Sequence, residues 1–275
     1  TVLMSNSLPE AIAHPTAVVM PGSELSPGVE IGPYAVIEPG VEVGANVKIG
    51  PHVHLLGRTL IGAGTVIGSG SVIGGEPQDK GYDGTRTLVR VGENCRIHEH
   101  VTIHRATTEG AGPFETVIGD RVMMMVNSHV GHNSRVDEDA ILVNGSLVAG
   151  HAHVCAGAIL SGNAALHQFG TIGRLTMVGG ATMVTKDAPP FSIVAGSYPV
   201  LWRSPNAVGL RRAGLEREER DALRKALYSI FRDSDSIQDA AESFMQNEFA
   251  TVRELAEFVL NSKRGVCAGR GSNKE

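Results

Sequence analysis

Histidine is the residue type in this sequence best suited to acid–base chemistry, and several histidines recur at regular spacing. His132, His151 and His167 follow one another at intervals close to eighteen residues, and His129 precedes the first of them. An imidazole has a pKa of about 6.5, so it can take a proton from a hydroxyl group near neutral pH. Three imidazoles can also coordinate zinc. The histidines therefore indicate either proton transfer or metal binding.

An apolar residue at every sixth position defines the elements that carry these histidines. The pattern runs from Ala13 to Ile73, continues from Val91, and runs again from Ile118 to Val184. The second position of each unit is often glycine, as expected where the chain turns, and the fifth is small. A period of six is neither a helix face nor simple strand alternation. It predicts an all-β solenoid, a parallel β-helix in which three six-residue sides make a coil of eighteen.

The repeat places the histidines in space. The units that contain His132, His151 and His167 begin eighteen residues apart, so these side chains should lie on one side of consecutive coils, within about 10 Å. They should point outward, with His129 at the adjoining corner. The alternative is that these histidines are ordinary surface residues without a shared role. Four histidines in one region favour a shared role.

Two segments interrupt the repeat and are expected to be loops. The first, residues 75–90, contains Gln78, Asp79 and Lys80, and the eighteen-residue step of the apolar pattern is kept across it. The second, residues 106–116, breaks the register. Loops on a rigid scaffold often carry binding residues. We interpret the first loop as functional. For the second loop, a functional role and a tolerated surface excursion are equally plausible.

Composition narrows the classes of protein. The net charge of -5 and the lack of a long Lys/Arg run argue against nucleic-acid binding, and no stretch reaches the roughly 18 to 20 apolar residues of a transmembrane helix. The protein is expected to be soluble. Cys95, Cys155 and Cys267 lie far apart without a CxxC pair, so neither a disulfide framework nor a cysteine zinc site is predicted. A reducing compartment is expected.

The end of the repeat predicts the domain organisation. We expect a solenoid domain at 1–187, a linker at 188–203 that begins with Ala-Pro-Pro, and a C-terminal α-helical domain at 204–275. Apolar residues at helical spacing within charged segments support the last assignment. This helical domain should cap one end of the solenoid.

Several segments resemble the UDP-N-acetylglucosamine O-acyltransferases that begin lipid A synthesis, a branch of the hexapeptide-repeat acyltransferases. They are TIHRAT, VNSHVGHNS, LVAGH, ALHQFG, VGGATMVTKDAPP and NAVGLRRAG. The resemblance implies a left-handed β-helix, a homotrimer, and transfer of an (R)-3-hydroxyacyl group from acyl carrier protein to the 3-hydroxyl of UDP-N-acetylglucosamine. It implies neither a metal nor a cofactor, since the acyl donor itself carries phosphopantetheine.

The same resemblance assigns roles to individual residues. His132 would be the general base, and the Gly150 N–H would stabilise the oxyanion. Gly180 would leave room for a long acyl chain. Contacts to the sugar nucleotide, the acyl group or the phosphopantetheine would come from Gln78, Asp79, Lys80, His129, Asn133, His151, His167, Gln168, Asn206 and Arg212. A basic face could dock acyl carrier protein, and its members are Arg211, Arg212, Arg217, Arg220, Arg224 and Lys225. For the last four of these six residues, a merely solvated helix is equally plausible.

The sequence departs from the family pattern at three positions. Asn133 stands where the family usually has aspartate, and it cannot stabilise an imidazolium by charge, although its amide can orient the ring. Lys80 is adjacent to Asp79, whereas the family lysine stands two residues after the aspartate. Val208 replaces a glutamate.

Two other hypotheses remain beside the acyltransferase: a γ-class carbonic anhydrase-like zinc protein, and a catalytically silent trimeric scaffold. The helical C-terminal region argues against the first, and the complete histidine set argues against the second. The expected compartment is the cytoplasm for a bacterial protein, or the mitochondrion for a plant homologue without its presequence.

Overall fold

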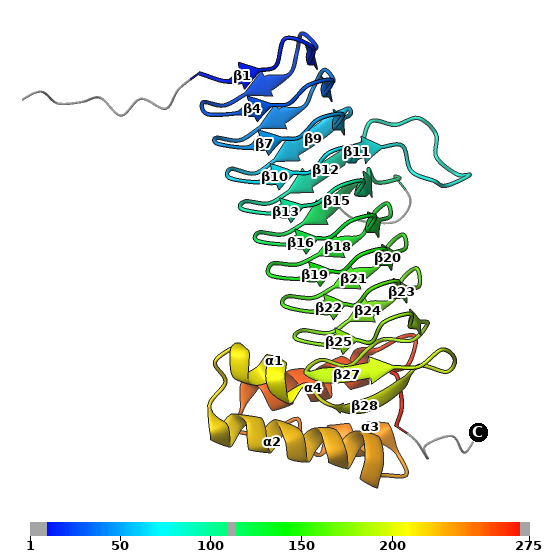
Figure 1. Ribbon diagram of the computed structural model, residues 1–275. Coiled ribbons are helices and arrows are strands. Elements are labelled where there is room, and N and C mark those ends of the chain that lie inside the picture. The colour runs from blue at the N-terminus through cyan, green and yellow to red at the C-terminus, as the bar shows by residue number, and fades with distance from the viewer. Residues whose placement is uncertain (1–9, 109–113, 270–275) are drawn as a thin grey trace, which may run out of the picture. The chain divides into compact units, whose positions relative to one another are not determined.

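The computed structural model describes residues 10–108 and 114–269. The chain divides into two compact units, Thr1–Ser134 and Arg135–Glu275. Short strands and turns alternate in both units, and helices follow in the second (Figure 1).

The first unit consists of three parallel sheets built from short strands. One sheet contains β1 (Ile12–Ala13), β4 (Glu30–Ile31), β7 (Lys48–Ile49), β10 (Val66–Ile67), β13 (Arg96–Ile97) and β16 (Met123–Met124). Another contains β2 (Val18–Val19), β5 (Val36–Ile37), β8 (His54–Leu55), β11 (Val72–Gly75), β14 (Thr102–His104) and β17 (His129–Val130). The last contains β3 (Glu24–Leu25), β6 (Glu42–Val43), β9 (Arg58–Ile61), β12 (Leu88–Val91) and β15 (Glu115–Ile118).

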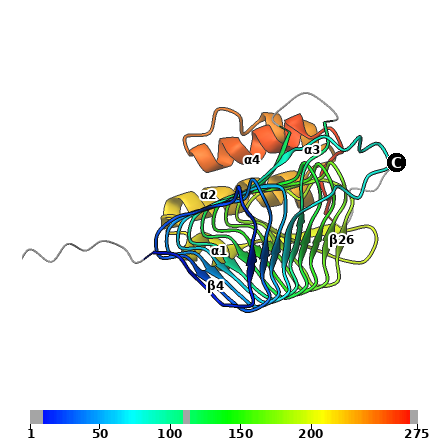
Figure 2. The ribbon, with the colours of Figure 1, turned by 90° about the horizontal axis from the view of Figure 1, so that it is seen from above.

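Strand pairing in the first coils has the predicted step of eighteen residues. Ile12 pairs with Glu30, and Glu30 pairs with Lys48. The backbone N–H groups of one coil donate to carbonyls of the next, as Ile12 N does to Val29 O at 2.8 Å. Figure 2 shows the coils of this unit stacked one behind another. The hexapeptide prediction is confirmed at the level of parallel sheets and their register.

Interior positions follow the predicted pattern. The small residues at the fifth position are all buried, and they are Ala35, Val41, Val47, Val53, Thr59, Thr65, Ser71, Ser128, Ser134, Ala140, Ser146, Ala152, Ala158 and Ala164. First positions are also buried, except in the first described coil, where Ala13 and Val19 are exposed and Leu25 is half-buried. These three residues belong to the first described coil, which has no described coil before it.

The turns differ from the expectation in their chemistry. The left-handed backbone conformation recurs at the fourth position of the repeat, for example at Asn133 (φ 57°) and His151 (φ 57°), whereas at the second position it is found at Gly74 (φ 89°), where the first insertion begins. Glycine at the second position serves close packing between coils: a Cβ on Gly62 would lie 2.4 Å from the carbonyl carbon of Gly92. The fourth position therefore aims a side chain at each corner, at some cost in backbone strain where the residue is not glycine or asparagine.

The two interruptions are insertions into the coil. The step between paired strands rises to thirty residues across the first, where Ile73 pairs with Ile103, and to 27 across the second, where Ile103 pairs with Val130. The eighteen-residue step from Ile73 to Val91 therefore does not mark one coil. The first insertion leaves the stack between β11 and β12 (Figure 1). Part of the second, residues 109–113, lies outside the described residues.

The second unit continues the same repeat in three groups of strands. The first group is β18 (Arg135–Val136), β21 (His153–Val154) and β24 (Thr171–Ile172). Another is β20 (Leu147–Val148), β23 (Ala165–Leu166) and β26 (Met183–Val184). The third is β19 (Ile141–Leu142), β22 (Ile159–Leu160), β25 (Met177–Val178), β27 (Ser192–Ala195) and β28 (Leu201–Pro205).

The segment at 188–203, expected to be a linker, carries regular structure. Strand β27 pairs parallel with β25 and antiparallel with β28, so the chain adds a hairpin to the sheet before the helices begin. Apolar side chains of these strands, such as Val194 and Trp202, are buried. The Pro-rich start of the segment gave no indication of these strands.

Helices predicted for the C-terminal region are present. They are α1 (Ala207–Arg212), α2 (Arg217–Tyr228), the π-helical turn η1 (Ser229–Asp233), α3 (Ile237–Glu242) and α4 (Ala250–Asn261). Their apolar faces share a core with the hairpin, in which Phe191, Trp202, Leu227 and Leu255 are buried. None of the helices in the described part of the chain is long and apolar enough to cross a membrane.

Candidate functional site

His132 lies just after β17, beside the corner residue Asn133. Its side chain is 14% exposed. The Nδ1 atom lies 2.9 Å from Asn133 Oδ1, and the Nε2 atom lies 3.6 Å from Asp79 Oδ2. The two ring nitrogens therefore face different partners, one amide and one carboxylate.

Asn133 is held so that its oxygen must face the imidazole. Its Oδ1 accepts from the Thr107 backbone N–H at 2.8 Å and from the Thr107 hydroxyl at 3.0 Å, and its Nδ2 donates to the Thr107 carbonyl at 3.1 Å. Flipping the amide would break these bonds. Because Oδ1 only accepts, His132 must carry its proton on Nδ1, so Nε2 is the basic nitrogen of the ring.

Asp79 is fixed by its own turn in the first insertion. Its Oδ1 accepts from the Gly81 N–H at 2.7 Å, and its carbonyl accepts from the Tyr82 N–H at 3.2 Å. The remaining oxygen faces His132. The structure thus places a carboxylate on the Nε2 side of the ring. Gln78 and Lys80 beside it are exposed.

His129 is a neutral neighbour of this pair. Its Nδ1 lies 2.7 Å from Thr102 Oγ1, and its ring meets His104 edge to face at 5.1 Å. Burial, together with the nearby His104 and His132, lowers the pKa of His129 to about 4. His129 can therefore donate or accept a hydrogen bond near pH 7 without adding a charge.

His104 belongs to the same cluster but was not selected from the sequence. Burial lowers its pKa, and its Nδ1 has no hydrogen-bond partner within the described residues. It lies outside the eighteen-residue histidine series because the second insertion lengthens the coil. The signal that finds it is the structural register, in which Thr102 pairs with His129.

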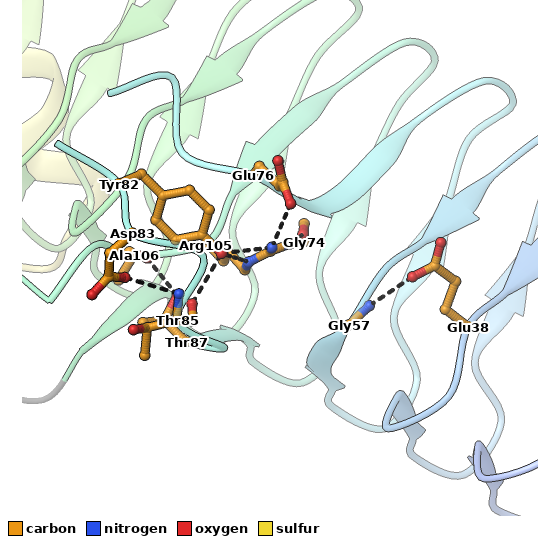
Figure 3. A network of polar contacts seen from close by, with 10 residues as sticks. All are labelled: Glu38, Gly57, Gly74, Glu76, Tyr82, Asp83, Thr85, Thr87, Arg105 and Ala106. Carbon is orange, nitrogen blue, oxygen red and sulfur yellow. Dashed lines mark hydrogen bonds and ion pairs between the residues drawn. The ribbon is translucent and has the colours of Figure 1, made fainter. Parts of the chain in front are cut away.

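Arg105 anchors the insertion that carries Asp79 (Figure 3). Its guanidinium donates to the Gly74 carbonyl at 3.0 Å, to the Tyr82 hydroxyl at 2.7 Å and to Glu76 at 3.1 Å. The Tyr82 hydroxyl in turn donates to Thr85 O at 2.9 Å. One half-buried cation therefore joins the start of the loop to its middle.

In the second unit, Gly150 and His151 occupy one corner of a coil. The Gly150 carbonyl accepts from Phe169 N at 3.2 Å, while its N–H has no acceptor among the residues that the structure describes. His151 stacks on Phe169, with ring centroids 4.8 Å apart and an interplanar angle of 18°. A backbone N–H without an internal acceptor is what an oxyanion site requires.

His167 and Gln168 are exposed, and the C-terminal segment returns to them. The Nδ1 of His167 lies 3.1 Å from Gln168 O and 3.3 Å from Arg264 Nη2. Arg264 is itself held by the Thr185 carbonyl at 3.0 Å. Arg264 is a cation at a predicted binding residue, and sequence spacing gave no sign of it because 97 residues separate the two.

The remaining predicted residues have different surroundings. Gly180 is exposed, and a Cβ there would meet only Gly162 O, at 3.5 Å. Asn206 is buried and caps α1: its Oδ1 accepts from Gly209 N at 3.0 Å, and its Nδ2 donates to Leu175 O at 2.8 Å. Arg212 is exposed in the last turn of α1.

The structure therefore brings together the predicted residues Asp79, His129, His132 and Asn133 in the first unit, with Gln78 and Lys80 on the neighbouring loop. In the second unit, His151, which follows Gly150 in the sequence, stacks on Phe169. His167 contacts Arg264. Asn206 has its side-chain amide engaged in the fold, which gives it a structural role whatever else it contacts.

Comparison with known proteins assigns the chain to a family. A family model described as UDP N-acetylglucosamine O-acyltransferase, domain 2, matches residues 187–267, and a model of bacterial transferase hexapeptide repeats matches residues 40–75. An acyl-(acyl-carrier-protein)–UDP-N-acetylglucosamine O-acyltransferase from Gloeothece citriformis is 40% identical over 71% of this chain and 71% of its own length. The chain belongs to the UDP-N-acetylglucosamine O-acyltransferase family.

Other members of the acyltransferase family agree with this assignment. The Synechocystis sp. protein of the same name is 43% identical over 61% of this chain, and the match spans 59% of that relative's length. The solved UDP-N-acetylglucosamine acyltransferase from Campylobacter jejuni has a TM-score of 0.89 and 31% identity, and covers 94% of this chain and 100% of its own. The γ-class carbonic anhydrase alternative is not favoured.

Proposed function

We propose that the chain transfers an (R)-3-hydroxyacyl group from acyl carrier protein to the 3-hydroxyl of UDP-N-acetylglucosamine, in lipid A synthesis. The names of the family members support this reaction. The structural observation that carries it is the pairing of His132 Nδ1 with Asn133, which directs Nε2 toward Asp79.

In the proposed mechanism, His132 acts first. Its Nε2 takes the proton of the sugar 3-hydroxyl, and the oxygen attacks the thioester carbonyl of the acyl donor. Asn133 holds the Nδ1–H throughout, and the Asp79 carboxylate stabilises the imidazolium. The bond from oxygen to carbon forms without an acyl-enzyme, since no serine or cysteine in a nucleophile elbow is present in the sequence.

The second half of the reaction releases the carrier. The negative charge on the former carbonyl oxygen is stabilised by the Gly150 N–H. When the carbon–sulfur bond breaks, the phosphopantetheine thiolate takes the proton back from His132. Phosphopantetheine and the sugar nucleotide arrive with the substrates, so the proposal requires neither a metal nor a resident cofactor.

The test is transfer of 3-hydroxyacyl groups from acyl carrier protein to UDP-N-acetylglucosamine by metal-free protein. Wild type should form product, and His132→Ala should lose ~10²–10⁴-fold in kcat, the usual share of a general base. His14→Ala, at an exposed histidine of the first coil, is the matched control and should keep full activity. Retention of most activity by His132→Ala would remove His132 from the mechanism. Carbon dioxide hydration without acyl transfer would favour the carbonic anhydrase instead.

We further propose a left-handed solenoid and a homotrimer. The trimer is supported by two exposed apolar side chains on the second unit, Leu147 of β20 and Met183 of β26, which pair on either side of the buried Ala165 of β23. Leu147 is 48% exposed and Met183 is 49% exposed. Exposed apolar side chains of this kind favour association between identical copies.

Acyl carrier protein would dock on the basic side chains at the start of the helical region. Arg211, Arg212 and Arg224 are exposed there, while Arg217 is partly neutralised by Asp221 at 3.8 Å. Of the two expected compartments, the bacterial relatives favour the cytoplasm.

A further inference from the structure

Asp137, His153 and Cys155 form a cluster of metal-ligand atoms that the proposed acyl transfer does not use. Their ligand atoms all lie within 4.8 Å of one another. His153 Nε2 lies 2.7 Å from Asp137 Oδ2 and 3.9 Å from Cys155 Sγ. Atoms around one tetrahedral zinc ion lie roughly 3–4 Å apart, given Zn–N and Zn–S bonds of about 2.0–2.3 Å. Small shifts of these side chains would give that geometry.

The hexapeptide repeat builds this cluster. Strands β18 and β21 pair in parallel, with Arg135 opposite His153 and Val136 opposite Val154. Since Val136 and Val154 point into the core, the residues on either side of each point outward. Two adjacent coils therefore present Arg135 and Asp137 in one row and His153 and Cys155 in the next, at the distance between neighbouring strands.

The surroundings of the cluster suit a bound cation. Asp137 uses its second oxygen, Oδ1, to accept from Arg135 at 2.5 Å, which orients the carboxylate and leaves Oδ2 toward His153. The side chain of His153 is 38% exposed and that of Asp137 is 16% exposed, so an ion can enter from solvent and keep a water molecule as its fourth ligand. A thiolate and a carboxylate together balance the two charges of a divalent cation.

We propose that Asp137, His153 and Cys155 bind a divalent cation that favours sulfur and nitrogen ligands, of which zinc is the type, and that this ion ties two coils of the second unit together. Carboxylate, imidazole and thiolate are all zinc ligands, and the sulfur disfavours magnesium and calcium. The ion is structural, because its three ligands take no part in the proposed acyl transfer.

Binding requires one proton to leave. Burial, together with the negative charges of Asp137 and Glu254, raises the pKa of the Cys155 thiol to about 12. Without metal the sulfur therefore keeps its proton. On binding, the S–H bond breaks, the zinc–sulfur bond forms, and the proton passes to solvent. No oxidant or reductant takes part.

Cobalt(II) and zinc binding to the metal-free, full-length protein test the site. Cobalt(II) should bind with one equivalent per chain and produce the near-ultraviolet absorption of a thiolate–cobalt bond, and zinc should displace it. Zinc should also raise the Tm. Cys155→Ser should abolish the thiolate band and the Tm shift, and His153→Ala should weaken binding at least tenfold.

Two further variants separate the site from general effects. Arg135→Ala removes only the residue that orients Asp137 and should weaken the metal roughly 10–100-fold without removing the band. Cys267→Ser, at a buried cysteine beside Lys186 O, is the matched control and should leave the band and the affinity unchanged. The proposal is overturned if wild type shows no thiolate band with excess cobalt(II), or if the band survives in Cys155→Ser. Acyl transfer by the metal-free protein is measured separately, so failure here leaves the proposed function standing.

Discussion

The two ring nitrogens of His132 face different side chains, Asn133 and Asp79. Asn133 accepts from Nδ1 without contributing a charge, while Asp79 faces Nε2 with a carboxylate. The resemblance described above leads one to expect an aspartate at the position of Asn133. In this chain, the amide supplies the orientation, and the negative charge comes from the loop on the other side of the ring.

Asn133→Asp should therefore change the pH dependence of the reaction, because it places a carboxylate beside Nδ1 in place of a neutral amide. The acid limb of the pH profile of kcat/KM should move to higher pH. The same change leaves the Thr107 carbonyl facing a carboxylate in place of an amide donor, so the free energy of unfolding should fall by about 1–3 kcal/mol.

Asn94→Asp provides the control for this experiment, since Asn94 occupies an exposed corner with the same left-handed backbone (φ 55°). Its pH profile should match wild type. An unchanged acid limb in Asn133→Asp would mean that Asn133 does not contact the base during turnover.

The open space at Gly180 leads to a second prediction, which concerns the length of the acyl chain. A Cβ there meets only one carbonyl oxygen, so a side chain fits without disturbing the coil. If the acyl chain runs past this point, Gly180→Met should fill its path and shift the preference toward shorter 3-hydroxyacyl chains. Competition between donors of different length measures this shift. An unaltered preference would place the acyl chain elsewhere.

Sequence spacing was sufficient for the repeat, and less so for the site. The period of six predicted which residues are interior because every coil repeats the same contacts, so one rule applies from Ala35 to Ala164. It could not predict His104 or Arg264, because those contacts cross an insertion or join distant segments. Nor could it show that Thr107 fixes the amide of Asn133.

At the scale of elements, the insertion between β11 and β12 is a loop held in place by hydrogen bonds from Arg105. Arg105, 12% exposed, joins Gly74, Glu76 and Tyr82 through hydrogen bonds from a charged donor. Such bonds contribute about 1.5–3 kcal/mol each. Without them the turn that presents Asp79 loses its support.

Arg105→Ala should raise KM for UDP-N-acetylglucosamine at least tenfold, a loss of about 1.4 kcal/mol, with a smaller change in kcat. Limited proteolysis should cut the loosened loop faster. Arg86→Ala, at an exposed arginine of the same insertion, should change neither measurement. Equal KM values for the two variants would show that the brace does not serve substrate binding.

At the scale of the whole molecule, the depressed pKa of His129 links folding to pH. The unfolded chain binds a proton on this residue near pH 6.5, while the folded chain resists it down to about pH 4. The contribution to stability is therefore complete above pH 6.5 and is lost as the pH falls toward 4. It amounts to up to about 3 kcal/mol.

Urea unfolding at several pH values measures this effect. Wild type should lose stability between pH 6.5 and 4, and His129→Asn should lose less over the same range. His14→Asn, at an exposed position, should follow wild type. A parallel pH dependence in His129→Asn and wild type would assign the acid sensitivity to other groups.

Each coil offers backbone donors and acceptors to both of its neighbours. Strand N–H groups donate to the following coil, as Ile12 does to Val29, while turn N–H groups donate to the preceding one, as Gly40 does to Gly22. A bare last coil would therefore be an open edge on which another chain could pair. In the second unit, the N–H groups of Gly173 and Gly179 instead donate to the carbonyls of Ala188 and Val194. Strand β27 pairs with β25 and the hairpin partner β28 follows, so we expect the C-terminal region to block association at this edge.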